Sequence, residues 1–314
     1  MKLLLYGRDF STWIPRLKEL AGDVTYETAT TEDEAIQHVA GADAFFGTIS
    51  PKILAAAQHL QWIQTPMAGL ERYFFPALIE HPVVVTNMRG IFHDMIPDHV
   101  TAYILCFARG LHTAIRRQLE RKWAPRDLSV VHLPGATLGI FGLGGIGYGV
   151  AQRAAPHGMR IIAIDPRRQD KPPEVAELRR PDRLDDLLAQ SDFVAVCAPE
   201  TPETRGLFDA SKFARMKPTA YFINVGRGRV VQLDPLVAAL QQKQIAGAAL
   251  DVFEQEPLPA NHPLWGMDNV IITPHTAGIS AHQEDRRLEV LAENVKRFIA
   301  GQPLHNVVDK ARGY

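Results

Sequence analysis

The chain has 314 residues, of which 46% are hydrophobic and 22% are charged. This composition is typical of a globular protein and excludes disordered, fibrous and membrane-bound chains. The 34 basic and 35 acidic side chains nearly cancel, so no attraction to nucleic acid or to a lipid surface is predicted. No apolar run approaches the ~20 residues of a membrane span, and residues 1–7 resemble a buried strand rather than a signal peptide. We interpret Cys106 and Cys197 as reduced core residues and predict a cytoplasmic protein.

The first part of the chain, up to about residue 92, alternates strand-like and helix-like segments. Helices are predicted over residues 11–21 and 51–58. The predicted strands cover residues 2–6, 44–47, 60–65 and 83–86. Alternation of this kind indicates βαβ units and a parallel sheet.

Residues 94–122 carry the longest helical pattern in the sequence. Asp94 can cap the helix and Pro97 suits its first turn. Four apolar residues recur on one face: Val100, Ile104, Phe107 and Leu111. We therefore expect one long helix, whose charged far end, residues 116–123, projects from the body of the protein.

Four titratable residues lie close together at the start of this helix: His93, Asp94, Asp98 and His99. They could indicate a metal site, but no third ligand region is visible in the sequence. Helix capping is the preferred interpretation, and no metal is predicted.

A second βαβ series begins at residue 137. Its predicted strands cover residues 137–141, 160–164, 193–197, 220–224, 246–250 and 270–272. Helices are predicted over residues 146–156 and 284–300, and the last is long enough to return to the first domain. We predict an α/β protein with two doubly wound, Rossmann-like parallel sheets. One domain is expected to comprise residues 1–93 plus 284–314, and the other, nucleotide-binding domain residues 94–283.

The second series opens with a glycine-rich turn. Gly142, Gly144 and Gly147 match the spacing G-x-G-x-x-G, directly after a strand and at the start of a helix. The first glycine permits a tight turn, the second a close approach of the pyrophosphate, and the third close packing of helix on strand. Gly145 and Ile146 begin the helix and offer N–H groups to the phosphates. A structural turn is the alternative, but the context favours dinucleotide binding.

Asp165 ends the strand that follows the glycine-rich turn. A carboxylate at this place suits the hydroxyls of an adenosine ribose and would repel a 2′-phosphate. Arg167 and Arg168 follow within reach and could bind that phosphate. NAD is therefore the predicted cofactor, with NADP as the alternative.

Three polar segments, residues 224–228, 251–257 and 273–278, each follow a strand of the second series. Ligands of doubly wound sheets bind beyond the carboxyl ends of the strands, so these segments are expected to lie at one site. They bring an arginine that can hold a carboxylate, a histidine that can exchange a proton, and glutamates that can stabilise the imidazolium.

This ordered set of motifs resembles the D-isomer-specific 2-hydroxyacid dehydrogenase family over nearly the whole chain. The resemblance implies that His275 is the general acid in reduction and the base in oxidation. It implies that Arg227 binds and polarises the 2-oxo acid, in an active site in the cleft between the two domains. The histidine's partner maps onto Glu256 rather than Glu254, although the two differ only by register.

The same resemblance implies further contacts. Asp251 maps onto the residue that contacts the nicotinamide amide, and His275 also belongs to the cofactor site. Positions lining the cofactor map onto Ala198, Val225 and Gly278. The substrate carboxylate is held by backbone N–H groups in residues 66–71, where Ala68 and Gly69 match the family. Three residues depart from the pattern common in the family: Met67, Glu71 and Asp98, the acid of the pair Asp98-His99.

We thus predict an oxidoreductase that uses NADH to reduce a small 2-oxo acid to the (R)-2-hydroxy acid. Residues 256–259 and 308–314 resemble the glyoxylate or hydroxypyruvate reductase branch. The alternative is an NAD-sensing binding protein like the corepressors on this fold, although the chain lacks a basic tail. Relatives commonly dimerise through the nucleotide domain, and a homodimer is predicted in which residues 116–123 take part and Trp123 is an anchor.

Overall fold

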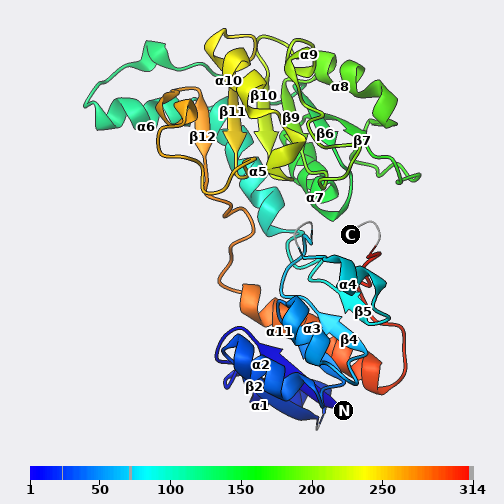
Figure 1. Ribbon diagram of the computed structural model, residues 1–314. Helices are drawn as coiled ribbons and strands as arrows, with labels where there is room; N and C mark the ends of the chain where they lie inside the picture. Colours follow the sequence, from blue (N-terminus) through cyan, green and yellow to red (C-terminus); the bar gives the residue numbers. More distant parts are fainter. Residues whose placement is uncertain (23, 71–72, 311–314) are drawn as a thin grey trace. The chain divides into compact units, whose positions relative to one another are not determined.

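The computed structural model describes residues 1–22, 24–70 and 73–310. It divides into two compact units (Figure 1). Unit 1 comprises Met1–Ile91 and Ser280–Tyr314, and unit 2 comprises Phe92–Ile279. Glu71 and residues 311–314, which entered the family resemblance, lie outside the described residues.

Unit 1 is built on a five-stranded parallel sheet in the order β2-β1-β3-β4-β5. Its strands are β1 (Lys2–Tyr6), β2 (Thr25–Ala29), β3 (Ala44–Phe46), β4 (Trp62–Gln64) and β5 (Val84–Thr86). Its helices are α1 (Trp13–Ala21), α2 (Glu32–Val39), α3 (Pro51–Ala56), α4 (Pro76–Glu80) and α11 (Gln283–Ile299). Three of these elements, β2, α2 and α4, were not predicted from the sequence. Strand β2 lies at the sheet edge with most of its residues partly or fully exposed, and it therefore lacks the apolar run of a central strand.

Helix α11 is fixed to this sheet by a buried polar network. The Asn294 amide donates to Gln64 Oε1 at 2.9 Å and to the His305 carbonyl at 3.1 Å. The Thr86 hydroxyl donates to the same Gln64 oxygen at 2.8 Å. All three polar side chains are fully buried, so their mutual hydrogen bonds satisfy groups that would otherwise destabilise the core. The last helix of the chain therefore belongs to the unit that contains the first strand.

Unit 2 contains a seven-stranded parallel sheet in the order β12-β11-β10-β9-β6-β7-β8. Its strands are β6 (Thr137–Phe141), β7 (Arg160–Ile164), β8 (Glu177–Arg179), β9 (Phe193–Val196), β10 (Tyr221–Asn224), β11 (Gly247–Leu250) and β12 (Val270–Ile272). Its α-helices are α5 (Met95–Ala108), α6 (Leu111–Leu119), α7 (Gly145–Ala154), α8 (Leu184–Gln190), α9 (Ala210–Phe213) and α10 (Leu233–Gln241). Short 3-10 turns are η1 (Pro125–Asp127), η2 (Ala155–His157), η3 (Pro181–Arg183), η4 (Gly228–Val230) and η5 (Pro263–Gly266). The strand order reverses at β6, which pairs with both β7 and β9, and ligands of such sheets bind at this switch point.

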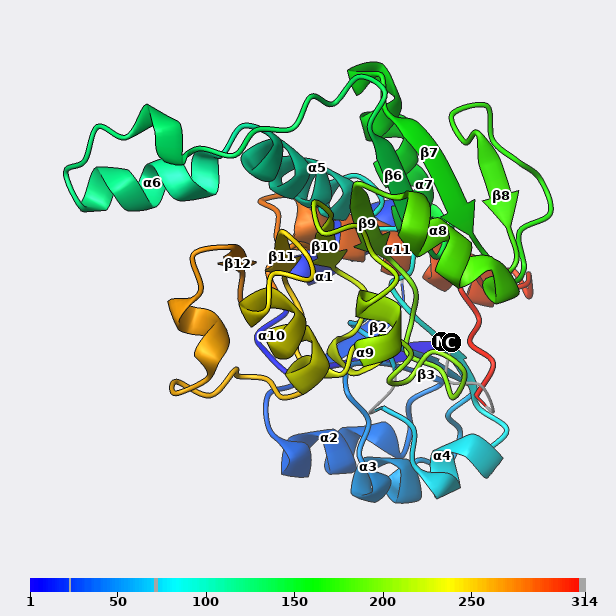
Figure 2. The same cartoon turned by 90° about the horizontal axis from the view of Figure 1, so that it is seen from above.

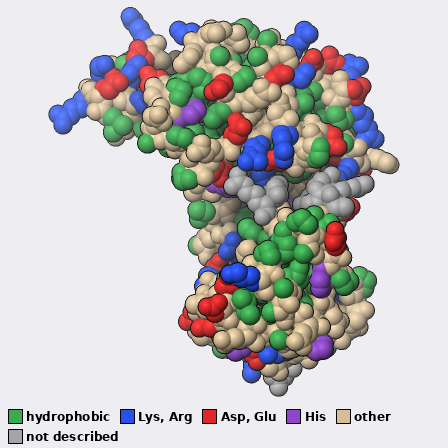
Figure 3. All heavy atoms as spheres, viewed as in Figure 1, with side chains coloured by type: hydrophobic (Ala, Val, Ile, Leu, Met, Phe, Trp, Pro, Cys, Tyr) green, Lys and Arg blue, Asp and Glu red, His purple; other side chains and the backbone are tan. Residues whose placement is uncertain are grey.

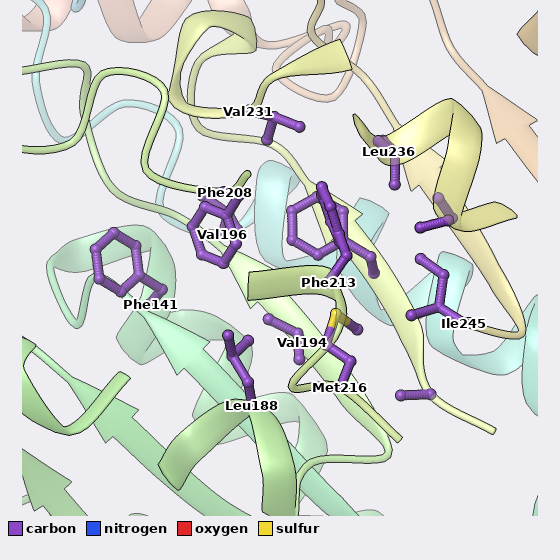
Figure 4. Packing of buried hydrophobic residues seen from close by; sticks show 14 of the residues in the cluster. Phe141, Leu188, Val194, Val196, Phe208, Phe213, Met216, Val231, Leu236 and Ile245 are labelled. Carbon is purple, nitrogen blue, oxygen red and sulfur yellow. The ribbon is translucent and has the colours of Figure 1, made fainter. Parts of the chain in front are cut away.

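Two apolar cores cover the faces of the unit 2 sheet. One contains residues of α8, α9 and α10 and the aromatic residues Phe141, Phe208, Phe213 and Phe222, of which Figure 4 labels the first three. The other contains residues of α5 and α7, with Val100, Ile104 and Phe107 packed over the strands. Helices on both faces of a parallel sheet confirm the predicted doubly wound α/β fold.

The expectation of one continuous helix over residues 94–122 is wrong. Helix α5 ends at Ala108 and α6 begins at Leu111, because Gly110 adopts a left-handed conformation with φ of 64°. A Cβ at this glycine would lie 3.0 Å from the Ser129 carbonyl oxygen. The chain therefore changes direction, and α6 extends away from the sheet of unit 2 (Figures 1 and 2). Leu111, predicted to lie on the buried face, is 49% exposed.

Within the described ranges, the structure contains no helix with the length and apolar character that crossing a bilayer requires.

Candidate active site

The glycine-rich turn between β6 and α7 is shaped by backbone contacts that exclude side chains. Gly142 has a φ of 95°, and a Cβ there would lie 2.8 Å from the Ala198 amide nitrogen. A Cβ on Gly147 would lie 2.0 Å from the Gly142 carbonyl oxygen. Gly144, by contrast, would meet nothing within 4 Å, so the space beside it is open. This combination fits a dinucleotide, since the tight turn presents an open backbone surface at the start of α7.

Gly145 and Gly149 make room for a helix contact that was not predicted from the sequence. A Cβ on Gly145 would lie 2.2 Å from His93 Nε2, and one on Gly149 would lie 2.6 Å from Pro97 Cγ. The start of α5 therefore lies directly against α7. The four-residue spacing of the two glycines, which places them on one face of the helix, was the available signal.

Asp165 lies at the end of β7 and is fixed by backbone donors. One carboxylate oxygen accepts the N–H of Leu143 at 2.9 Å, and the other accepts those of Arg167 and Arg168 at 2.8 and 2.9 Å. The Arg168 guanidinium pairs with Asp170 at 2.9 Å and lies 4.9 Å from the centre of the Tyr148 ring. The acid thus lies beside the glycine-rich turn, and Arg168 is held by its own neighbours.

His275 and Glu256 form a close pair. His275 Nδ1 lies 2.8 Å from Glu256 Oε2, and Glu256 Oε1 accepts the N–H of Phe253 at 2.9 Å. With Nδ1 facing a carboxylate, Nε2 is the ring atom that can exchange a proton with a substrate. Glu254 instead lines a cavity of about 750 Å³ together with Arg205 and Arg229. The structure therefore places Glu256, and not Glu254, against the histidine.

The environment of Glu256 keeps it ionised. Burial raises the pKa of its carboxyl, but the hydrogen bonds from His275 and from the Phe253 N–H, with the nearby charge of Arg227, lower that pKa further than burial raises it. The net pKa lies below the ordinary value for glutamate. An anion is thus available at neutral pH to stabilise a protonated imidazole.

Arg227 follows β10 in a loop that its flanking glycines allow to pack closely. A Cβ on Gly226 would lie 2.4 Å from the Ala198 carbonyl oxygen, and one on Gly228 would lie 1.9 Å from the Phe253 carbonyl group. The Asn224 side chain closes the loop, accepting the Gly226 N–H and donating to the Arg227 carbonyl, both at 3.1 Å. The glycines of the Gly-Arg-Gly motif therefore bring the arginine loop against the loop that carries Glu256.

Asp251 is almost fully buried, with 2% of its surface exposed. Its oxygens accept the N–H groups of Thr276 at 2.8 Å and Ala277 at 3.1 Å, and the hydroxyl of Thr273 at 2.5 Å. The aspartate thus anchors the loop around His275. This anchoring role was not predicted from the sequence motifs.

The remaining predicted cofactor and substrate residues lie in unit 2 and in unit 1, respectively. Ala198 and Val225 are buried at strand ends of unit 2, and a Cβ on Gly278 would lie 3.0 Å from the Phe92 ring. Ala68 and Gly69 lie half-buried in unit 1 after β4, where the Ala68 carbonyl accepts the Asn87 amide at 2.7 Å.

The titratable residues predicted to cluster at the start of α5 each contact a different neighbour. Asp94 accepts the Met95 N–H at 2.9 Å, Asp98 pairs with Arg153, and His99 contacts Thr273. Among the residues that the structure describes, no group of three His, Cys, Asp or Glu side chains could hold a metal ion.

Comparison with known proteins identifies the family. Residues 101–277 match the profile of the D-isomer specific 2-hydroxyacid dehydrogenase NAD binding domain. The chain belongs to the D-isomer specific 2-hydroxyacid dehydrogenase family. A glyoxylate reductase of Thermofilum pendens is 35% identical over 306 residues, which cover 94% of this chain and 90% of that protein.

Two solved structures share the fold over the full chain. A D-isomer specific 2-hydroxyacid dehydrogenase family protein from Aeromonas salmonicida has a TM-score of 0.86 at 32% identity, covering 98% of this chain and 99% of that one. A family member from Xanthobacter autotrophicus, solved with NADPH and MES, has a TM-score of 0.85 at 32% identity, covering 100% and 99%. These matches confirm the predicted family, its oxidoreductase class acting on CH–OH groups, and a nicotinamide dinucleotide cofactor, NAD with NADP as the alternative.

Proposed function

We propose that the protein reduces a small 2-oxo acid, such as glyoxylate or hydroxypyruvate, to the corresponding (R)-2-hydroxy acid with NADH. The observation that carries this proposal is the His275–Glu256 pair at 2.8 Å, beside the packed Arg227 loop at the carboxyl ends of the sheet. The similarity to a glyoxylate reductase supports the choice of substrate.

Each residue of the proposed site has a distinct task. Arg227 binds the 2-oxo acid through its guanidinium, which suits a carboxylate and the negative charge that develops on the carbonyl oxygen. His275 Nε2 donates a proton to that oxygen, and Glu256 stabilises the imidazolium before the transfer. A bound NADH supplies the hydride.

The family resemblance further supports assigning residues 1–93 plus 284–314 to substrate binding and residues 94–283 to NAD binding. On that assignment, the backbone N–H groups of Ala68 and Gly69 hold the substrate carboxylate. The cofactor residues are Gly142, Gly144, Gly145, Ile146, Gly147, Asp165, Ala198, Val225, Asp251, His275 and Gly278.

The surroundings of Asp165 support a preference for NADH over NADPH. Its carboxylate lies beside the glycine-rich turn, so it can accept hydrogen bonds from ribose hydroxyls and repel a phosphate. Arg168 already pairs with Asp170 and packs on Tyr148, which makes it less available to a 2′-phosphate. NADPH is then the weaker cofactor.

The experiment that tests the function is NADH oxidation with a panel of 2-oxo acids that includes glyoxylate, hydroxypyruvate, pyruvate and phenylpyruvate. The proposal expects turnover to be fastest with the smallest acids. NADH binding without turnover of any acid would contradict the proposal and favour the NAD-sensing binding protein.

Helix α6 supports a homodimer through unit 2. Leu111, Ile115 and Leu119 recur every four residues and are 49%, 56% and 80% exposed, and Trp123 beyond them is 97% exposed. Figure 3 shows charged side chains on the same projecting arm. A second copy that presents the same apolar stripe would cover it in a two-fold arrangement. Sedimentation should therefore give a dimer at micromolar concentration, and Ile115→Glu with Leu119→Glu should give a monomer.

The thiols and the net charge bear on where the protein is located and on which partners it binds. Cys106 and Cys197 are free thiols, which supports a reducing, cytoplasmic location. The near-neutral net charge of −1 offers no basis for a nucleic-acid partner.

A further inference from the structure

The backbone of His275 adopts an unfavourable conformation. Its φ is 55°, in the left-handed region that residues with a Cβ seldom occupy. Such a conformation persists only where the surrounding structure holds it. The His275 N–H donates to the carbonyl oxygens of Asp251 at 2.9 Å and of Thr273 at 3.1 Å. The next two N–H groups are held by the Asp251 carboxylate. The position of the catalytic ring therefore depends on the position of one buried aspartate.

A chain of hydrogen bonds connects that aspartate to α5. Thr273 Oγ1 lies 2.5 Å from Asp251 Oδ1 and 2.5 Å from the Tyr103 hydroxyl, and His99 Nε2 lies 3.2 Å away. A carboxylate only accepts hydrogen bonds, so the single proton of the Thr273 hydroxyl points to Asp251. Thr273 must then accept from Tyr103, whose hydroxyl is the donor.

The donor end of this chain lies on a rigid support. Tyr103 is 4% exposed, and its helix neighbours Val100, Ile104 and Phe107 are buried in the core of unit 2. Burial raises the pKa of the Tyr103 phenol, so the hydroxyl keeps its proton. The His99 ring packs edge-on against the Tyr103 ring with centroids 4.5 Å apart, which fixes the tyrosine further.

We propose that Tyr103 is a positioning residue for the catalytic histidine, acting through Thr273 and Asp251 to hold the backbone of residues 275–277. The proposal rests on the proposed function, in which His275 transfers the proton. Loss of the Tyr103 hydroxyl would remove one of the contacts that fix Thr273, loosen the hold of Thr273 on Asp251, and allow the left-handed turn to relax. The imidazole would then move from both Glu256 and the substrate, and small displacements of reacting groups reduce rates strongly.

Tyr103→Phe removes only the donor, and Thr273→Val removes the link while keeping its shape. Each variant should lower kcat about fivefold to tenfold, the effect of one neutral hydrogen bond. The alkaline limb of the pH profile for reduction should move to lower pH in both variants, because the imidazolium is less well paired with Glu256. Thr273→Ser retains the hydroxyl and should remain within about twofold of the wild type.

Tyr221→Phe is the matched control. Tyr221 is also 4% exposed, and its ring stacks on Phe107 in the same core. Its hydroxyl interacts with Ser129, outside the His275 loop. This variant should keep the wild-type kcat and pH profile. Equal effects in Tyr103→Phe and Tyr221→Phe, or an unchanged pH profile in Tyr103→Phe, would overturn the proposal.

Hydrogen exchange separates this proposal from the proposed function. In the complete protein, the Thr276 and Ala277 amides should exchange about fivefold to tenfold faster in Tyr103→Phe and Thr273→Val, and at the wild-type rate in Tyr221→Phe. This readout needs no turnover, so it applies even if no 2-oxo acid is reduced. Unchanged exchange in both variants would show that Tyr103 does not hold the loop.

Discussion

The glycine-rich turn after β6 and the His275 loop after β12 both follow strands of one sheet, yet they are held in opposite ways. Around Gly142 and Gly147 the backbone packs on itself, and even a methyl group would collide. Around His275 the backbone is held by the oxygens of Asp251, whose carboxylate also accepts the hydroxyl of Thr273. An added side chain at Gly142 or Gly147 should therefore lower the stability of the fold strongly. Loss of a single hydrogen bond around His275 should lower activity by a smaller amount.

The largest effect is expected within the turn. Gly147→Ala places a Cβ 2.0 Å from the Gly142 carbonyl oxygen, and we expect a loss of more than about 3 kcal/mol in the free energy of unfolding. Gly144→Ala meets nothing within 4 Å and should change stability by less than about 1 kcal/mol while weakening NADH binding. Denaturant unfolding and NADH fluorescence measure the two quantities. Equal stability of the two variants would refute the packing argument.

The next effect tests the loop at its reactive residue. His275→Ala should reduce turnover by ~100-fold or more, because general acid catalysis typically contributes that much. NADH should still bind, since the turn that holds the pyrophosphate keeps its packing. Steady-state kinetics beside a direct NADH titration will show this. A variant with near-normal turnover would remove His275 from the proposed mechanism.

A smaller effect concerns cofactor choice beside the turn. Asp165→Ala removes the carboxylate that accepts from Leu143, Arg167 and Arg168. We expect the preference for NADH over NADPH to fall by about tenfold or to reverse, because the repulsion of a 2′-phosphate is lost. The specificity constants for both cofactors measure the change. A wild-type enzyme that already prefers NADPH would contradict this assignment.

The smallest expected change is a shift in pH dependence. Glu256 has a lowered pKa in the folded protein. Its carboxylate is therefore anionic at neutral pH and is protonated only as the pH falls through that lowered pKa. In Glu256→Gln the His275 imidazolium loses the anion that lies 2.8 Å away and is therefore less well stabilised. The alkaline limb of the reduction profile should therefore move to lower pH by about one unit.

Glu254→Gln is the control for register, since Glu254 lines a cavity together with Arg205 and Arg229, whereas Glu256 pairs with His275. Its pH profile should match that of the wild type. If only Glu254→Gln moved the profile, the pairing seen in the structure would not be the functional one.

The same contrast explains what could be predicted from the sequence. The turn and the three strand-end motifs are local patterns whose spacing carries their chemistry, and the family and doubly wound fold were therefore predicted correctly. The link from Tyr103 to Thr273 joins residues 170 positions apart, and no local pattern records it. The contact of His93 with Gly145 also joins distant segments, and the spacing of Gly145 and Gly149 indicated a packed face of α7 but not the segment that covers it.

Two errors in the secondary structure have local physical causes. The break after Ala108 depends on a left-handed Gly110, whereas the apolar spacing of Leu111 continued the helical pattern across it. Strand β2 pairs on one side only and carries mostly polar residues, so its sequence lacks the signal of a buried strand.

The buried pairing of Asn294 with Gln64 has a consequence for synthesis of the chain. The partners are 230 residues apart, so unit 1 has an unusually non-local core and cannot close until the last helix has left the ribosome. Unit 2 is one uninterrupted segment, and domains generally fold as units while the chain grows. During translation, unit 2 should therefore finish folding before unit 1, whose first strands can pack with α11 only after that helix has been synthesised.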